Sequence, residues 1–168
     1  MPILDPHGLD FTSQSAEQTQ RFGMRIGQLL QPGDVVCLSG ELGAGKTTLA
    51  VGIGRGWGVL EQVTSPTFVI VKEYHRADGS ALHHVDAYRL GSETDIVSSG
   101  FPERLDAQKT LLIEWPEHVT DWLPQERLWI SLDYLGNERR ALHLNPHGAR
   151  FEQLMVVFRK ATFGQQVA

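Results

Sequence analysis

The sequence of 168 residues contains a single cysteine, Cys37, so no disulfide can form within the chain. It has no run of about 18 apolar residues, which excludes a transmembrane helix. Its first residues lack the basic start and apolar stretch of a secretory signal peptide. These absences predict a cytoplasmic protein in a reducing compartment, with no membrane partner.

Positive charge is also scarce. Lys and Arg together number 15 against 20 Asp and Glu, which leaves a formal net charge of −5. A protein whose main task is to grip nucleic-acid phosphates normally leans basic, because Lys and Arg neutralise the backbone. The balance therefore argues against a DNA-binding protein, and any nucleic-acid role is expected to be indirect.

The composition is otherwise that of a globular protein, with 41% hydrophobic and 21% charged residues. A length of 168 residues fits one domain. We therefore expect residues 1–168 to form a single domain, with a tail that frays after about residue 163. The glycines are unevenly spread: seven of the 17 fall between Gly40 and Gly58. Such a cluster marks backbone that must approach something closely.

Hydrophobic periodicity predicts an α/β fold. Ser15 and Gln18 fit a capping box, and an apolar face follows at the spacing of a helix. Short apolar runs at 35–38 and 110–113 are typical of strands buried on both faces. Alternation at 128–134 and 140–145, around Gly136-Asn137, predicts an antiparallel hairpin. Further strands are expected at 67–74 and 81–85, and further helices at 46–55, 93–99, 102–107, 116–122 and 151–160.

The most specific motif is Gly40-Glu41-Leu42-Gly43-Ala44-Gly45-Lys46-Thr47, which matches G-x-x-x-x-G-K-[ST] at every fixed position. Glycines let backbone N–H groups curl around a phosphate, and the following helix offers unpaired N–H groups to the anion. Lys46 would supply a charge for the β- and γ-phosphates, and the Thr47 hydroxyl a ligand for Mg²⁺. The motif predicts a P-loop NTPase-type fold with a mainly parallel sheet, flanking helices and a late antiparallel hairpin.

A phosphate loop also needs an acidic residue that organises Mg²⁺ and water. Asp86 and Glu114 each follow an apolar strand, and ligands of open α/β sheets bind at the carboxyl ends of strands. The purer apolar run precedes Glu114, which makes it the better magnesium organiser. Asp86 would then orient water. His83 and His84 raise the alternative of a zinc site, but adjacent residues of a strand point to opposite faces, so one of them at most can lie near Asp86.

Other nucleotide-binding classes fit less well. None of the four lysines stands in the [NT]-K-x-D motif with which GTPases recognise guanine, so adenine is the expected base. A small-molecule kinase remains an alternative, although a whole helix precedes the loop and a hairpin occupies the region of the usual arginine-rich lid. A nucleotide-binding protein without hydrolysis is a third possibility.

Four blocks occur in a fixed order: the phosphate loop from Gly40 to Thr48, Ser65-Pro66-Thr67-Phe68, His84-Val85-Asp86-Ala87-Tyr88-Arg89-Leu90, and Ile113-Glu114-Trp115-Pro116-Glu117. In that order and spacing they resemble the TsaE family (also called YjeE), the bacterial ATPase of tRNA threonylcarbamoyladenosine synthesis. The resemblance covers about residues 12 to 145. The phosphate loop is shared by many families, whereas the other three blocks together are far more specific.

The resemblance implies a role for individual residues. ATP would be bound by Gly43, Ala44, Gly45, Lys46, Thr47 and Thr48, and Mg²⁺ by Thr47 and Glu114. Asp86 resembles the family's catalytic or switch II-like acid, and it would act in catalysis with Lys46. Ser65 and Thr67 would lie in a switch-like segment that senses the γ-phosphate. Trp115 corresponds to the tryptophan beside the metal-binding glutamate. Arg139 is expected to reach toward the nucleotide, and the stretch from Ser13 to Glu17 to flank the adenine.

The resemblance also implies partners. Members of the family are not the transferase itself; they act as a switch on a pair of proteins, TsaB and TsaD, and hydrolyse ATP to allow repeated turnover. The modified product is adenosine 37 of tRNAs that read codons beginning with A. Contact with tRNA would be indirect, through the complex, which is consistent with the net charge of −5.

Overall fold

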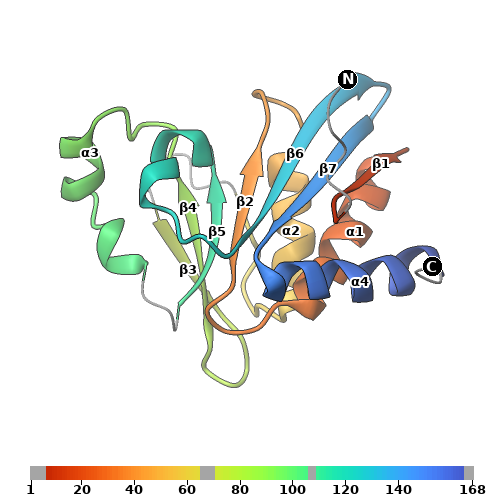
Figure 1. Cartoon of the computed structure of the whole chain (residues 1–168), viewed down its shortest axis with the longest axis horizontal. Coiled ribbons are helices and arrows are strands. Elements are labelled where there is room, and N and C mark those ends of the chain that lie inside the picture. Colours follow the sequence, from red (N-terminus) through yellow and green to blue (C-terminus); the bar gives the residue numbers. More distant parts are fainter. Residues whose placement is uncertain (1–6, 65–70, 106–108, 165–168) are drawn as a thin grey trace.

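A twisted sheet of seven strands crosses the molecule in the order β1-β7-β6-β2-β5-β4-β3 (Figure 1). The computed structural model describes residues 7–64, 71–105 and 109–164. The strands are β1 (Leu9–Ser13), β2 (Val35–Ser39), β3 (Val71–His75), β4 (Ala81–Asp86), β5 (Thr110–Glu114), β6 (Arg127–Gly136) and β7 (Arg139–His147). The helices are α1 (Ala16–Leu29), α2 (Lys46–Trp57), α3 (Glu93–Ser98) and α4 (Ala149–Phe163), with the 3₁₀ segments η1 (Pro102–Arg104) and η2 (Pro116–Trp122).

The sheet is mixed. Its centre, β6-β2-β5-β4, is parallel, while β1, β7 and β3 pair antiparallel at the two sides. The expected α/β class and the late hairpin are confirmed, but antiparallel pairs are as numerous as parallel ones among the described residues. Part of the difference is β1, which the hydrophobic pattern did not predict. This short edge strand pairs with β7, and only two residues join it to α1. Its apolar residues therefore could not be separated from the hydrophobic pattern of the helix.

Each face of the sheet carries its own core. Helices α1, α2 and α4 cover one face, and α3, η1 and η2 lie over the other (Figure 1). Strand β2 serves both cores, since Val36 and Leu38 pack toward α2 while Val35 and Cys37 pack on the opposite side. The apolar run therefore marks a strand buried on both faces, as predicted. Burial raises the pKa of the Cys37 thiol to about 12, so it stays protonated and inert.

Helices α1 and α2 pack unusually closely because glycines face each other across the contact. A Cβ atom built on Gly27 would lie 2.1 Å from the carbonyl oxygen of Ile53, and one built on Gly56 would lie 2.0 Å from that of Met24. At Gly23 and Gly52 the nearest opposing backbone oxygens would lie 2.6 Å and 2.2 Å from such a Cβ. In each helix the two glycines are four residues apart and so share one face. Part of the glycine cluster between Gly40 and Gly58 therefore serves helix packing.

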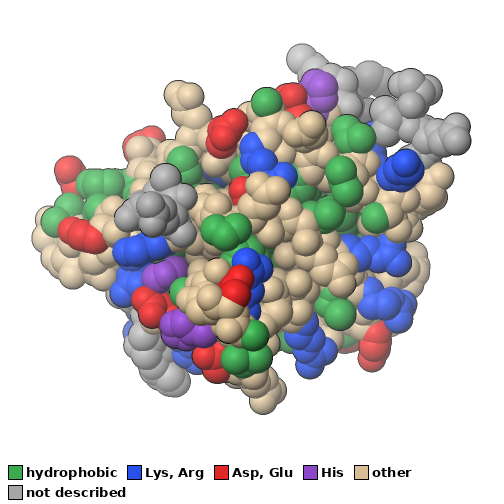
Figure 2. Space-filling view, turned by 90° about the horizontal axis from the view of Figure 1, so that it is seen from below, with side chains coloured by type: hydrophobic (Ala, Val, Ile, Leu, Met, Phe, Trp, Pro, Cys, Tyr) green, Lys and Arg blue, Asp and Glu red, His purple; other side chains and the backbone are tan. Residues whose placement is uncertain are grey.

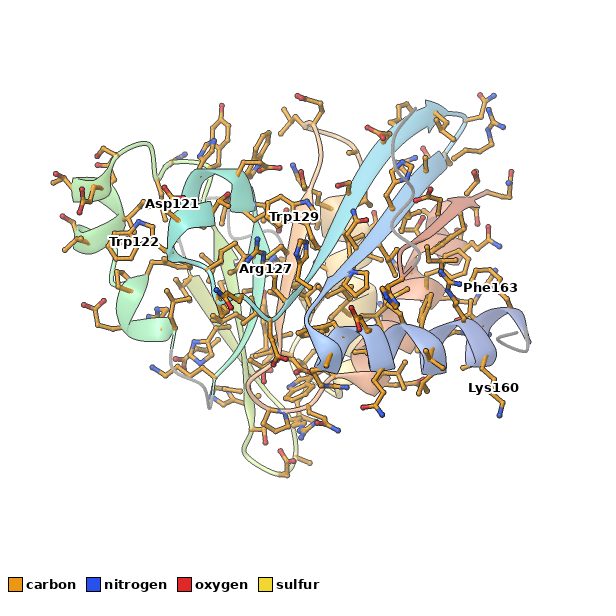
Figure 3. All side chains as sticks on the ribbon, viewed as in Figure 1. Asp121, Trp122, Arg127, Trp129, Lys160 and Phe163 are labelled. Carbon is orange, nitrogen blue, oxygen red and sulfur yellow. The ribbon has the colours of Figure 1, made fainter. Side chains whose placement is uncertain are left out.

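The last helix extends further than predicted, to Phe163, and packs against β7 and α1. The ring of Phe163 lies 5.7 Å from Phe11 and 6.2 Å from Phe22, so it closes the end of the core beneath β1. Figure 3 shows Phe163 pointing toward α1 and β1, and Lys160 pointing away from the body. The expected fraying of the tail concerns residues 165–168, which lie outside the described residues.

The remaining predicted elements are confirmed with small changes of extent. Strand β3 begins at Val71 and the segment after Trp115 is a 3₁₀ helix, while residues 65–70 and 106–108 lie outside the described part.

On the lower face of the molecule, opposite the carboxyl ends of the parallel strands, side chains of both charges lie among small hydrophobic groups (Figure 2). Among the described residues no helix is long and apolar enough to cross a membrane.

Candidate functional site

The carboxyl ends of β2, β5 and β4 lie side by side at the upper edge of the sheet in Figure 1, where β2 runs into the phosphate loop. The register pairs Glu114, the last residue of β5, with Leu38 on one side and with Asp86 on the other. The two acids thus end neighbouring strands. Leu112, two residues before Glu114 on β5, and Leu82, four residues before Asp86 on β4, belong to the core beneath α2. Side chains an even number of residues apart on a strand share a face, so both acids project toward the helix that begins at Lys46.

The phosphate loop is built to admit an anion. Gly45, at the N-cap of α2, has a φ of 106°, a conformation in which other residues are strained, and as a glycine it has no side chain to cap the first N–H groups of the helix. At Gly40 a Cβ would lie 2.6 Å from the carbonyl oxygen of Leu132. The loop therefore fits against β6 only with glycine, and it leaves the positive end of α2 open.

A cavity of about 570 Å³ lies over this loop. Most of the predicted ATP and magnesium residues line it, namely Gly43, Gly45, Lys46, Thr47, Thr48, Asp86, Glu114 and Trp115. Sequence reasoning assigned no role to Glu41, Leu42, Tyr88, Arg89 and Arg140, which also line it. Tyr88 and Arg89 belong to one of the blocks that carry the resemblance and lie two and three residues after Asp86, so their position was a signal that sequence reasoning left unused.

Three predicted residues or segments lie elsewhere. The side chain of Ala44 is buried in the core, so its contribution to a ligand is limited to its backbone. Arg139 is not among the residues that line the cavity; its neighbour Arg140 is. In the stretch from Ser13 to Glu17, Ser15 caps α1 and Ser13 is buried against Thr19, so these serines hold the start of the helix. Ser65 and Thr67 lie outside the described residues.

Two contacts hold the Lys46 side chain at the wall of the cavity. Its ammonium group donates to the carbonyl oxygen of Gly40 and lies 3.7 Å from the centre of the Trp115 ring. The residue is only 6% exposed. Burial lowers the pKa of Lys46, and nearby carboxylates oppose that shift: Glu114, Glu117, Asp86 and Glu41. Within the described part of the chain, none of these carboxylates forms an ion pair with Lys46, whose direct partners are a carbonyl oxygen and an aromatic ring, so a phosphate can compete for its charge.

Trp115 has a left-handed backbone conformation, with φ 58° and ψ 49°. For a residue other than glycine this costs about 1–2 kcal/mol. The turn brings the Trp115 ring beside Tyr88, at 5.0 Å, and His118, at 6.0 Å, as well as against Lys46. Strain of this kind persists only where the surroundings impose it, and it clusters at functional sites.

The two acids differ in their surroundings. Glu114 is 5% exposed, and its Oε2 lies 2.6 Å from Nε2 of the fully buried His84. Asp86 is half-buried and accepts a hydrogen bond from the backbone N–H of Tyr88 at 3.0 Å. His83 points to the opposite face, where its Nδ1 lies 3.0 Å from Arg104. The two adjacent histidines thus face opposite sides of the sheet, as expected, and His84 contacts Glu114.

Arg140 reaches the loop from β7. A Cβ on Gly45 would lie 2.7 Å from Arg140 Nε, and the guanidinium stacks over Tyr134 at 4.4 Å. The Nε atom is buried and has no hydrogen-bond partner among the described residues. Arg140 therefore adds a positive group to the wall of the cavity, in addition to Lys46 and Arg89.

The donor set suits Mg²⁺ better than a transition metal. The described residues contain no group of three or more His, Cys, Asp or Glu side chains that could hold a metal ion. Mg²⁺ is ordinarily held through one or two protein oxygens together with substrate phosphates and waters. The hydroxyl of Thr47 and the carboxylate of Glu114, both on the wall of the cavity, fit that pattern.

Comparison with known proteins gives consistent matches. A family model described as threonylcarbamoyl adenosine biosynthesis protein TsaE matches residues 13–142. Two relatives carry the name tRNA threonylcarbamoyladenosine biosynthesis protein TsaE. The one from Bacillus subtilis (strain 168) is 37% identical over 147 residues, 87% of this chain and 90% of its own. The one from Treponema pallidum (strain Nichols) is 40% identical over 130 residues, which are 77% of this chain and 95% of its own.

The crystal structure of Bacillus subtilis YdiB superimposes with a TM-score of 0.74 at 33% sequence identity, and covers 92% of this chain and 95% of that chain. The fold is thus the P-loop NTPase type of α/β fold that the phosphate loop predicts. The family match spans nearly the same residues as the sequence blocks and ends within β7, so α4 lies beyond it.

Proposed function

This chain belongs to the TsaE family of tRNA threonylcarbamoyladenosine biosynthesis proteins, and on that basis we propose that it binds ATP with Mg²⁺ and hydrolyses it as an accessory protein of this tRNA modification. One observation carries the proposal. Lys46, Thr47 and two strand-end carboxylates converge on one cavity over an uncapped helix N-terminus.

The residues that line the cavity fit a nucleoside triphosphate. The backbone of residues 43–48 would bind the phosphates, because the α2 N-terminus offers unpaired N–H groups and Lys46 a positive charge. The close approach of the loop to Leu132 and Arg140 leaves no room for a Cβ at Gly40 or Gly45. Arg140 and Arg89 would add further positive charge at the wall of the cavity. Ser65 and Thr67 remain candidates for sensing the γ-phosphate.

Two carboxylates would share the catalytic work. Bound Mg²⁺ would neutralise charge that develops on the phosphate oxygens. Glu114 and Thr47 would hold it, since both line the cavity and Glu114 is buried at the end of β5. Asp86 is half-buried and lines the same cavity, so it would orient the attacking water. Trp115 would shield the reacting phosphates from solvent by its position over Lys46.

We further propose that the chain acts with the proteins TsaB and TsaD on adenosine 37 of tRNA, and that ATP hydrolysis resets the complex between turnovers. The net charge of −5 supports indirect contact with tRNA. The test is reconstitution of the modification from purified TsaB, TsaD and tRNA, with and without this chain. Multiple turnovers that depend on the chain and on ATP are expected. An equal yield without it would contradict the accessory role.

Substitutions of the two acids should affect different properties, namely the rate of ATP hydrolysis for Asp86 and the Mg²⁺ requirement of nucleotide binding for Glu114. We expect Asp86→Asn to bind ATP and Mg²⁺ nearly normally yet hydrolyse ATP at least about 10-fold more slowly, about 1.4 kcal/mol of barrier, because a water-orienting acid acts mainly in the transition state. Glu114→Gln should need much more Mg²⁺ for half-maximal nucleotide binding. Magnesium titrations of binding and single-turnover hydrolysis measure both effects. A magnesium defect in Asp86→Asn alone would reverse the assignment.

A further inference from the structure

His84 is a polar side chain on the face of β4 that packs beneath α2. It is fully buried, and Leu82, two residues earlier, and Leu112, its register partner on β5, both belong to the core beneath that helix. A histidine in such a place costs free energy unless its ring is hydrogen-bonded. Its position therefore calls for a reason beyond packing.

The hydrogen-bond partner of His84 is on the neighbouring strand β5. His84 pairs in register with Leu112, so Glu114 is its diagonal neighbour on the same face. The Nε2 atom lies 2.6 Å from Glu114 Oε2, both groups being shielded from water. A carboxylate in the ionised form, the form that binds Mg²⁺, can only accept hydrogen bonds, and the partner in that form is the Nε2–H of the ring. The other ring nitrogen, Nδ1, is buried and has no partner among the described residues.

We propose that His84 is a positioning residue for the magnesium site: its Nε2–H holds Oε2 of Glu114 and leaves Oε1 to face Mg²⁺. The inference rests on the proposed function and deepens it. Without the bond the carboxylate can rotate, and the nearby ammonium group of Lys46, to which Glu114 is electrostatically coupled, would attract it. A carboxylate turned toward Lys46 would no longer be oriented to hold Mg²⁺.

The test separates positioning from stability. Binding of a fluorescent ATP analogue, mant-ATP, is measured against Mg²⁺ concentration and in EDTA, and the melting temperature is measured for every variant. His84→Leu keeps the volume and removes the donor. We expect it to raise the Mg²⁺ concentration for half-maximal binding about 10-fold or more, the usual effect of removing a partner that orients a metal ligand. Its affinity in EDTA should stay within about threefold of wild type.

Two further variants give the matched comparisons. His84→Gln places an amide N–H about where Nε2 lies, and its Mg²⁺ requirement should return to within about threefold of wild type. His83→Leu removes the adjacent buried histidine, which faces the opposite side and contacts Arg104. It should shift the melting temperature and leave the Mg²⁺ requirement unchanged. If His84→Leu does not fold, His84→Asn replaces it, because its amide is too short to reach Oε2.

The Glu114→Gln background supplies a double-mutant cycle. If His84 acts through Glu114, adding His84→Leu to Glu114→Gln should change the Mg²⁺ requirement by less than about twofold. The inference is overturned if His84→Leu keeps the wild-type requirement, if His83→Leu shifts it equally, or if His84→Gln is no better than His84→Leu. Absence of mant-ATP binding by the wild-type protein would instead refute the proposed function, and this inference with it.

Discussion

Replacing Lys46 by alanine is expected to weaken ATP binding by at least about 100-fold. Among the described residues, the lysine is the one ammonium group on the wall of the phosphate-loop cavity, and a charge-assisted hydrogen bond to phosphate contributes about 1.5–3 kcal/mol. Two such bonds lost together correspond to about 3 kcal/mol or more. The fold should survive, because the side chain contacts a carbonyl and one face of Trp115 rather than the apolar core. Calorimetric titration with ATP measures the loss.

A second lysine gives the matched control. Lys160 lies near the end of α4 and points away from the body (Figure 3). Lys160→Ala changes the net charge by the same amount and should bind ATP as the wild type does. Wild-type affinity and hydrolysis in Lys46→Ala would refute the assignment of the cavity to ATP. A large drop in stability without a binding defect in the folded fraction would refute it as well.

Replacing Gly27 by alanine is expected to destabilise the protein by at least about 3 kcal/mol. Alanine is favoured over glycine inside a helix by about 1 kcal/mol, so helix propensity alone predicts stabilisation. The new Cβ, however, would lie 2.1 Å from the carbonyl oxygen of Ile53, and backbone cannot yield as a side chain can. Helices α1 and α2 would have to separate and open the core around Leu49 and Ile53.

The stability prediction is checked by denaturant unfolding and by the melting temperature. For a domain of this size about 3 kcal/mol corresponds to a fall of roughly 6–12 °C. Gly91→Ala is the matched control, because a Cβ there meets only Asp95 Oδ2, at 3.9 Å. It should change stability by less than about 0.5 kcal/mol. A Gly27→Ala protein as stable as wild type would show that the helices separate at little cost.

Much of the site could be predicted from the sequence. The phosphate loop is contiguous, and its spacing reflects local chemistry that no distant contact has to supply. Asp86 and Glu114 follow apolar runs, and the parallel pairing of β4 with β5 places them side by side as expected. The buried strand β2 was recognisable because it is apolar, whereas the segments before and after it in the sequence are not. These segments are the polar turn at 31–34 and the glycine-rich phosphate loop.

The glycines show where such reasoning stops. Their clustering signalled close approach of backbone, and this is correct, but nothing in the sequence said what approaches. At Gly40 and Gly45 it is the strand and side chain beside the loop; at Gly52 and Gly56 it is the opposing helix. The second role depends on Gly23 and Gly27 nearly thirty residues earlier, and only the packing of α1 on α2 brings the two pairs together.

The sequence by itself determined the phosphate loop, the strand-end acids and the family, because each resides in short runs whose spacing carries the chemistry. Only the tertiary structure decided that Arg140 rather than Arg139 lines the cavity and that His84 rather than His83 contacts Glu114. Both choices turn on strand register, since successive side chains of a strand face opposite sides. For the arginines the register includes an irregularity between Tyr134 and Gly136. Such a shift of one residue depends on pairing between distant segments, which local patterns do not encode.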